Sequence, residues 1–338
     1  MPLKVSDEEF ISCWKRLGSP ARISEALGID VRQIYRRRAA IEERHGLILD
    51  AADEAKSKRP RISVPKNGYR AINENITGAV IVASDLHAWP GDRSVAFDAL
   101  VELIKELKPV LIIANGDSVD MASISRHPPI GWQTVPSVAE ELDAAKELHA
   151  ELESAAPNGT PLVWLYGNHC LRFNTRLASE APEFRGVPGA SLEDHFPAWD
   201  FAMSMHLNKH TVVMHSWHNG VHSAYNNAVK SGVNTVTGHT HRLQAVQWAD
   251  YNGLRWGIEC GSLSDFGPDQ PKFHYTLDRP VNWSQGFSVL NFAPNGMLLE
   301  PEFCRVLNGT AYFRGQSICS KGGIVKVLPQ KTGKKIAA

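Results

Sequence analysis

Five clusters of polar residues, each placed directly after an apolar run, constrain this sequence more than any other feature. They are Asp85-Leu86-His87, Gly116-Asp117, Gly167-Asn168-His169, His215 and Gly238-His239-Thr240-His241. Short apolar runs are typical of buried strands, and the loops that follow strands in an α/β domain bring side chains from distant segments together. Carboxylate, amide and imidazole groups suit Mn²⁺, Fe²⁺, Zn²⁺ or Mg²⁺ better than a metal that requires thiolates. The pattern therefore predicts an α/β domain with a metal site at the strand ends.

The spacing within the clusters predicts which side chains meet. Residues two apart in extended backbone point to the same side, so Asp85 and His87 are expected to hold one ion. His239 and His241 could reach one site in the same way. Taken singly, a histidine near an apolar run or a Gly-Asp turn is more often structural than functional. The ordered series of five clusters is what indicates a functional site.

Beyond residue 78, apolar runs alternate with amphipathic stretches, and this alternation predicts the secondary structure. Strands are expected at 78–84, 110–114, 162–166, 211–214, 234–237, 245–249, 254–258 and 287–292. Helices are expected between the first three strands, and Ser137 with Glu140 would cap the second of them. The chain is thus divided into a helical domain at 1–48, a basic linker at 49–77, the α/β domain at 78–316 and a basic tail at 317–338.

Residues 6–48 are expected to form three short helices. Ser6 with Glu9 is typical of a capping box, Pro20 is placed to begin the second helix, and Gly28 is placed to end it. The order of a short helix, a glycine turn and a longer helix resembles a helix-turn-helix. The polar faces of the third helix carry the candidates for DNA contact, Arg32, Gln33, Arg36 and Arg37. The alternative is a bundle that only docks on its neighbour.

Charge and cysteine content exclude some classes of protein. The 36 basic and 36 acidic residues cancel, so nucleic-acid affinity would need a local cluster of charge. The five cysteines are odd in number and lack a CxxC pair, which suits a reducing compartment. The sequence has no basic-then-apolar leader and no apolar stretch long enough to span a bilayer, so we expect a cytoplasmic protein without a membrane partner.

The motif series DxH, GD, GNH, H and GHxH, read in this order from Gly78 to Arg242, resembles that of the calcineurin-like metallophosphoesterase superfamily. The resemblance implies a four-layered αββα sandwich, here with the small helical domain at its N-terminus. It also implies two divalent metal ions, which can generate a nucleophile from water at neutral pH and clamp the attacking and leaving oxygens. Mn²⁺ is the metal expected first, with Fe²⁺, Zn²⁺, Mg²⁺, Ni²⁺ and Co²⁺ as alternatives.

The same resemblance assigns roles to individual residues. The first ion would be held by Asp85, His87 and His241, and the second by Asn168, His215 and His239. Asp117 would bridge the two ions. His169 would be the catalytic residue, which stabilises developing charge and protonates the leaving oxygen.

Two positions depart from the family pattern. Cys170 follows His169 where the family usually has Asp or Glu, a side chain that can orient the catalytic imidazole by a hydrogen bond. A thiol is a weak substitute for that carboxylate. His215 is followed by Ser216-Trp217 where many members have Gly-His, so the choice of His215 over His218 rests on its place at the end of a strand.

The metal motifs do not choose among phosphatases, phosphodiesterases, nucleotidases and nucleases. Met121-Ala122 stands where protein phosphatases have Arg-Gly, which disfavours that class. The fuller pattern, including residues 124–127, 222–225 and 282–287, resembles members from phages and prophages that are described as DNA exonucleases. Trp89, Trp132, Trp217 and Trp283 could stack bases if they lie near the metals, although core packing is the commoner role.

The prediction is a metal-dependent phosphodiesterase that acts on nucleic acid, with DNA as the expected substrate and either exo- or endonuclease action. Residues placed to meet substrate phosphates are Arg126, His127, Arg172 and His218. The main alternative is a phosphoesterase for a nucleotide or cyclic nucleotide, and a third reading is a catalytically decayed DNA-binding regulator. The oligomeric state is left open, with a homodimer among the alternatives.

Overall fold

The apolar runs of the sequence form the central strands of a nine-stranded sheet in the computed structural model, which describes residues 5–17, 20–47, 49, 71–127, 130–267, 271–276, 279–321 and 323–324. Four strands of this sheet run parallel, in the order β2 (Gly78–Ala83), β3 (Leu111–Asn115), β4 (Leu162–Leu165) and β5 (Asp200–Ala202). On the other side of β2 the sheet continues antiparallel through β11 (Gly286–Phe292), β12 (Glu302–Leu307), β13 (Thr310–Phe313), β14 (Gln316–Ser320) and β15 (Gly323–Ile324).

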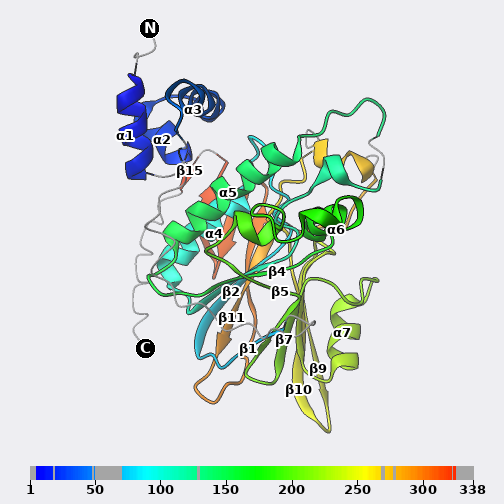
Figure 1. Cartoon of the computed structure of the whole chain (residues 1–338). Helices are drawn as coiled ribbons and strands as arrows, with labels where there is room; N and C mark the ends of the chain where they lie inside the picture. The colour runs from blue at the N-terminus through cyan, green and yellow to red at the C-terminus, as the bar shows by residue number, and fades with distance from the viewer. Residues whose placement is uncertain are drawn as a thin grey trace, which may run out of the picture.

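A second, six-stranded sheet packs against the first (Figure 1). Its strands follow the order β1 (Ala71–Glu74), β6 (Ser204–Leu207), β7 (Thr211–Met214), β8 (Asn234–Thr237), β10 (Gly253–Cys260) and β9 (Leu243–Asp250). Successive side chains of β2 point to opposite faces of the larger sheet, as in any β-strand. Val80 and Val82 are buried between the sheets, whereas Ile81 faces the helices on the outer side.

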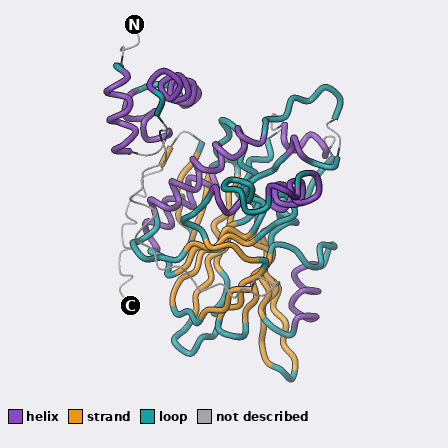
Figure 2. Tube along the Cα trace, viewed as in Figure 1, coloured by secondary structure: helices purple, strands orange, loops and turns teal. Residues whose placement is uncertain are grey.

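Helices cover both outer sides of this pair of sheets (Figure 2). On the larger sheet lie α4 (Val95–Leu107), α5 (Val138–Ala155) and α6 (Cys170–Glu180), and α7 (Ser223–Ser231) packs on β8, β9 and β10 of the smaller sheet. Short 3-10 helices are η2 (Ala122–Ile124), η3 (Pro182–Phe184), η4 (Leu192–His195) and η5 (Pro271–Thr276). The expected four-layered αββα sandwich is therefore confirmed, and so is the capping box of Ser137 and Glu140.

The N-terminal residues form a separate three-helix bundle with its own core, composed of α1 (Asp7–Leu17), α2 (Pro20–Leu27) and α3 (Val31–His45). The backbone N–H of Glu9 donates to the Ser6 hydroxyl at 3.1 Å, as the capping signal predicts. Phe10, Trp14 and Ile34 are buried at its centre. The bundle contacts α5 through Tyr35, whose hydroxyl donates to the Glu147 carboxylate at 2.5 Å.

Regular structure extends past the expected limits of the α/β domain at both ends. β1 lies within the stretch expected to be a linker, because it pairs with β6 and buries Ile72 completely. A four-residue strand with one buried apolar side chain is too short to show the alternation of apolar and polar residues by which strands are recognised in a sequence. At the other end β14 and β15 lie in the stretch expected to be a tail, of which residues 325–338 fall outside the described part, as do residues 50–70 of the linker.

No described helix is long and apolar enough to cross a membrane. Each of the five cysteines lies in the described ranges and is buried as a free thiol.

Candidate metal centre

The five polar clusters lie where strands of both sheets end. Asp85 and His87 follow β2, Asp117 follows β3, His215 follows β7, and the His239 and His241 loop follows β8. The carboxyl ends of neighbouring parallel strands meet at one edge of a sheet, which is where α/β proteins bind their ligands. The fold therefore brings together residues up to 156 positions apart in the sequence.

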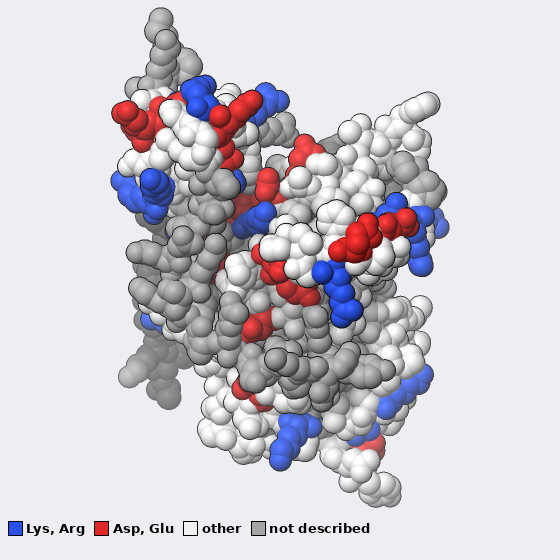
Figure 3. Space-filling model, viewed as in Figure 1, with Lys and Arg blue, Asp and Glu red and all other residues white. Residues whose placement is uncertain are grey.

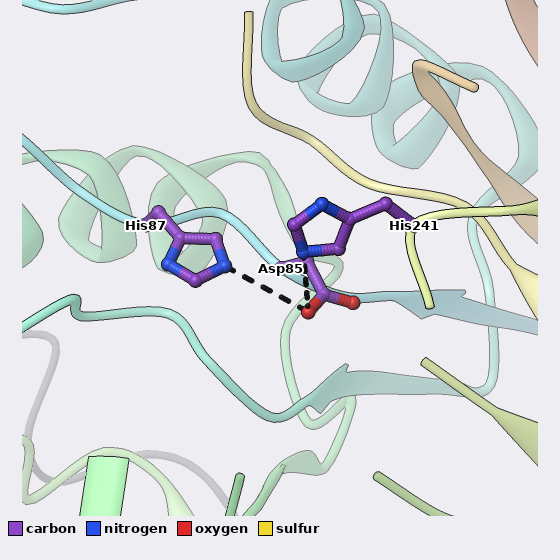
Figure 4. Close-up of side chains that lie close together, drawn as sticks. All are labelled: Asp85, His87 and His241. Atoms are coloured by element: carbon purple, nitrogen blue, oxygen red, sulfur yellow. Dashed lines mark ion pairs between the residues drawn. The ribbon is translucent and has the colours of Figure 1, made fainter. Parts of the chain in front are cut away.

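The first group of ligand side chains is Asp85, His87 and His241. All three are buried, and their ligand atoms lie within 4.8 Å of one another. Oδ1 of Asp85 is 3.2 Å from Nε2 of His241 and 3.8 Å from Nε2 of His87, so both rings point at the same carboxylate oxygen (Figure 4). This is the set that the resemblance assigns to one ion.

A second group, Asp117, His215 and His239, meets the same 4.8 Å limit. Nε2 of His215 lies 2.9 Å from Oδ2 of Asp117, and the His215 and His239 rings meet edge to face with centroids 5.3 Å apart. Asn168, which the resemblance adds to this set, is exposed in the loop before α6. The neighbouring His169 backbone N–H donates to Oδ1 of Asp117 at 2.8 Å, so this loop is fastened to the second group.

In His215 and His87, Nδ1 forms a hydrogen bond that points away from the centre, and Nε2 points into it. Nδ1 of His215 lies 2.8 Å from the Asn115 carbonyl, which can only accept, so Nδ1 carries the proton. Nδ1 of His87 is 3.0 Å from the Asp120 carboxylate and donates in the same way. The Nε2 lone pairs therefore face the centre, as in histidines whose outer nitrogen is oriented for metal binding.

Buried atoms without hydrogen-bond partners show that these residues fit a cation. Among the described residues, Oδ1 of Asp85 and the Nε2 atoms of His87 and His215 are buried and lack a hydrogen bond of normal geometry. The other Asp85 oxygen is satisfied by the Ser84 hydroxyl at 2.5 Å and the His239 backbone N–H at 2.9 Å. Burying a carboxylate oxygen and two ring nitrogens without normal hydrogen bonds is costly unless a positive charge, either ring protons or a bound cation, lies among them.

The backbone at the ligands is left-handed. Asp85, His87, His239 and His241 have φ angles of 56°, 45°, 67° and 55°, a region that non-glycine residues rarely adopt and that is concentrated at functional sites. Asp85 and His87 do fall in one group, as expected, but not through the extended backbone that the prediction assumed. For the second pair the prediction is wrong, because His241 joins the first group and His239 the second, as the family resemblance implies.

Two glycines are required by close contacts within the centre. A Cβ atom on Gly116 would lie 2.3 Å from Nδ1 of His215, and one on Gly167 would lie 2.1 Å from Oδ1 of Asp117. Neither contact can be relieved without moving a ligand side chain. The GD and GNH motifs thus need glycine for the packing of the ligands against each other.

Burial and nearby carboxylates shift the pKa values of the four histidines in the two groups. Burial lowers the pKa of His87, but hydrogen bonds to Asp120 and Asp85 outweigh it and raise that pKa to about 9. Burial likewise opposes the charge of His215, but Asp117 and Asp85 raise its pKa to about 9. Burial lowers the pKa of His241 and His239. Protons on such rings must leave when a cation binds, so metal affinity will depend on pH.

Asp120 is a site residue that sequence reasoning missed. Its Oδ1 lies 2.7 Å from Nδ1 of His169 and also 3.0 Å from Nδ1 of His87. Cys170 cannot share this task, because it is completely buried and burial raises the pKa of its thiol to about 11. The carboxylate that contacts His169 therefore belongs to the loop of the GD motif. In the sequence, its one mark is that an aspartate lies three residues after Asp117.

The four residues expected to meet substrate lie at different distances from the centre. Arg172 is adjacent to it, because one guanidinium nitrogen donates to the Asp120 carbonyl at 2.8 Å and another lies 3.3 Å from Nε2 of His169. Arg126 and His127 are exposed and contact each other at 3.5 Å. His218 belongs to neither group, since its backbone pairs with Asn227 and its ring packs on Trp217.

Two buried glutamates hold the loops that carry the site, and no sequence pattern marked them. Glu141 of α5 accepts the backbone N–H groups of Met121 and Ala122, immediately after Asp120. Burial raises the pKa of Glu141 to about 7. Glu259 of β10 accepts the hydroxyl of Thr240, the residue between His239 and His241.

The candidates for DNA contact on α3 differ in exposure. Gln33 and Arg36 are exposed. Arg37 is half-buried within the bundle, 3.7 Å from the Asp7 carboxylate and with its guanidinium over the Phe10 ring. The Arg32 side chain falls outside the described part of the structure.

Comparison with known proteins adds one match that covers most of the chain. The sequence profile of the calcineurin-like phosphoesterase family matches residues 78–315, and a search of curated proteins found no match. Among solved structures, the chain is similar to Zn²⁺-bound Vps29 from Entamoeba histolytica (11% identity, TM-score 0.36, covering 69% of this chain and 96% of that one). It is also similar to an archaeal phosphodiesterase (14%, 0.33, 68% and 99%) and to the nuclease MPE of Pseudomonas putida (12%, 0.29, 67% and 84%). At these scores the structural likenesses carry no argument about function.

Proposed function

Because this chain belongs to the calcineurin-like phosphoesterase family, and is therefore a hydrolase of ester bonds, we propose that it is a two-metal phosphodiesterase that cleaves DNA in the cytoplasm. The proposal rests on the two groups of candidate ligands, each made of one aspartate and two histidines, and on the hydrogen-bonded side chains of Asp120 and His169 beside them. The family uses a dinuclear centre of divalent ions, and the two groups supply the ligand types for it.

In the proposed centre Asp85, His87 and His241 hold one ion, and Asn168, His215 and His239 hold the other. Asp117, which contacts His215 and the His169 backbone, is the proposed bridge. Oxygen and imidazole ligands without a thiolate are compatible with Mn²⁺, the metal that we propose, and equally with Fe²⁺, Zn²⁺ or Mg²⁺. When bound, such a pair of ions activates water and neutralises the charge of the phosphate.

The remaining chemistry is assigned to side chains that touch the centre. Asp120 holds a proton at Nδ1 of His169, which fixes the orientation of the ring and leaves Nε2 for the substrate. In the proposal the ring also takes up a proton from solvent at Nε2 before the reaction and passes it to the leaving oxygen of the ester, as a general acid. Arg172, 3.3 Å from that nitrogen, is placed to hold a phosphate oxygen by charge-assisted hydrogen bonds.

Support for a polymer substrate comes from exposed polar side chains of α3 in the N-terminal bundle, which remain accessible although the bundle is docked on α5. Tyr35 contacts α5 at one end of the interface, and Arg22 contacts Ser154 of the same helix. The exposed Gln33 and Arg36 remain available on α3. Acidic and basic side chains are intermixed on the face of the molecule in Figure 3, so any DNA contact there would be local.

The proposal is tested by hydrolysis assays on the full chain loaded with Mn²⁺. Single-stranded and double-stranded DNA are compared with bis-p-nitrophenyl phosphate, a nucleoside monophosphate and cyclic nucleotides. The Asp117→Asn variant, purified in the same way, measures the background from contaminating nucleases. Cleavage of DNA by the wild-type chain above this background supports the proposal.

Each alternative predicts a different outcome. Hydrolysis of cyclic nucleotides or nucleotides but not of DNA would identify a small-molecule phosphoesterase. DNA binding without hydrolysis in any divalent metal would identify a regulator that has lost its activity. Either result would replace the nuclease proposal.

A further inference from the structure

Four aromatic side chains form a continuous layer against the first ligand group. This aromatic layer is composed of Phe266, Phe273, Tyr275 and Trp283, which contact one another in a network of tilted and edge-to-face pairs. It reaches the ligands directly: the ring centroid of Trp283 is 4.6 Å from that of His241, and the centroid of Phe273 is 5.7 Å from that of His87.

The chain on either side of the layer is fastened to the ligand loops. The buried ammonium group of Lys272 donates to the His87 carbonyl at 3.1 Å and also contacts the Asp92 carboxylate. Next to Trp283, the backbone N–H of Ser284 donates to the His241 carbonyl at 2.7 Å. Because both anchors end on ligand residues, the aromatic layer is held in a fixed position relative to the centre.

Core packing explains only part of the layer. Phe273 is 7% exposed and packs like a core residue, but Tyr275, at the other end, is 50% exposed. The Tyr275 centroid lies 6.3 Å from that of Trp283, which is itself half-buried. The layer thus presents aromatic surface to solvent at its Tyr275 end.

Ring contacts place the exposed ring close to the first ligand group: the centroid of Tyr275 is 6.2 Å from that of Phe273, which in turn contacts the His87 ring. Burial raises the pKa of the Tyr275 hydroxyl to about 12, and the negative charges of Asp120, Asp85 and Asp117 add to this effect. The charge of Arg172 acts on the same hydroxyl in the opposite direction. The exposed ring therefore lies one aromatic neighbour away from both His87 and His241, beside the first ligand group.

We infer that Tyr275 and Trp283 form a stacking surface for a nucleobase next to the scissile phosphate. The inference rests on the proposed function and names the substrate more closely. Stacking on an aromatic ring accepts any base but requires that the base be free of its own neighbours, so the site selects single-stranded DNA or a frayed strand end. The rings supply contact area with little loss of side-chain freedom, since the layer is already fixed.

The experiment compares two variants of Tyr275 in the full chain. Tyr275→Leu removes the ring, Tyr275→Phe restores it without the hydroxyl, and the fully exposed Tyr251, in the turn between β9 and β10, supplies the matched control Tyr251→Leu. The substrates are a single-stranded oligonucleotide and the same strand with an abasic residue next to the cleaved phosphate. KM and kcat are measured for each protein on each of the two strands, and the affinity of each protein for each strand is measured by fluorescence anisotropy.

For the wild-type chain, removal of the base should raise KM by about tenfold or more, since stacking on one ring contributes that much affinity. Tyr275→Leu should lose most of this discrimination between base and abasic strands, in KM and in anisotropy, while Tyr275→Phe recovers it and Tyr251→Leu keeps it. The wild-type chain should also cleave single strands faster than a blunt duplex.

Three results would overturn the inference. In the first, Tyr275→Leu keeps the full discrimination between the two strands. In the second, Tyr275→Leu lowers kcat equally on both strands, which would mean that the ring only supports the metal ligands. In both cases DNA cleavage itself would persist and the proposed function would stand. If instead the wild-type chain hydrolyses bis-p-nitrophenyl phosphate but no DNA, the proposed function fails and the inference fails with it.

Discussion

The carboxylate of Asp120 lies 2.7 Å from Nδ1 of His169. The same oxygen lies 3.0 Å from Nδ1 of His87, so one buried carboxylate contacts both a proposed metal ligand and the proposed catalytic histidine. Burial opposes its charge, but its hydrogen bonds to the two rings hold the pKa of Asp120 well below its usual range. Asp120 is therefore ionised at neutral pH.

Asp120→Asn should lower kcat by about 100-fold, because the amide cannot replace the charge that holds His169. If Asp120 acts mainly through His169, Asp120→Asn should slow a chain that already carries His169→Ala much less than it slows the wild-type chain, and the small remaining loss should come from its contact with His87. Asp98→Asn, in an exposed ion pair with Arg93, is the control and should keep full activity. Additive losses in the double variant, measured by steady-state kinetics, would contradict this role.

Asp117→Asn should abolish hydrolysis and lower the amount of bound metal, because Asp117 is the proposed bridge and contacts His215 at 2.9 Å. His169→Ala should behave differently, keeping its metal while losing most of the rate. Elemental analysis of both variants after equal loading with Mn²⁺ checks the distinction. Near-normal turnover of Asp117→Asn would remove it from the centre.

Arg36→Ala should weaken DNA binding to a similar extent for all sequences and reduce the slope of log K against log salt by about one, the loss of one phosphate contact. Hydrolysis of bis-p-nitrophenyl phosphate should stay unchanged. Lys15→Ala removes an exposed cation from α1 and serves as the control. An unchanged slope for Arg36→Ala would favour a bundle that only docks on α5 through Tyr35.

The central strands and the motifs that form the two candidate ligand groups could be recognised in the sequence because the signals were local. β7 and β8 begin and end at the expected residues, since short apolar runs between polar turns mark a buried strand. The ligands lie in short motifs directly after such runs. Their grouping could not be derived from strand geometry, because the left-handed backbone at His239 and His241 sends the two rings to different groups.

Other parts of the site depended on contacts that no local pattern records. Asp120 acquires its role only when α6 brings His169 beside it, and Glu141 reaches the same loop from α5. The aromatic layer comes from residues 266–267, 271–276 and 279–283, and the short η5 is the one helix or strand among these described residues. The edge strand β1 was missed because its pairing with β6 is set by tertiary structure and not by its own four residues.

His149 should make the protein lose stability in mild acid. Its ring is 1% exposed, stacked on Trp164 with centroids 4.3 Å apart, and among the described residues neither of its nitrogens has a hydrogen-bond partner. Burial therefore lowers the pKa of His149 from 6.5 to about 3. Above pH 6.5 the ring is neutral in both folded and unfolded chains. Between pH 6.5 and about 3 only the unfolded chain binds the proton, so the free energy of unfolding falls as pH falls.

The contribution of this single group is about 1.4 kcal/mol per pH unit. His149→Phe should remove it, so the variant should gain roughly 3 kcal/mol relative to the wild-type chain between pH 6.5 and 4.5. Urea unfolding of the metal-free proteins at several pH values measures the difference without a contribution from metal loss. Phe196→Leu loosens the same aromatic pocket without removing an ionisable group, so it should lower stability equally at all pH values. Parallel curves for His149→Phe and the wild-type chain would mean that His149 is protonated or solvated in the folded protein.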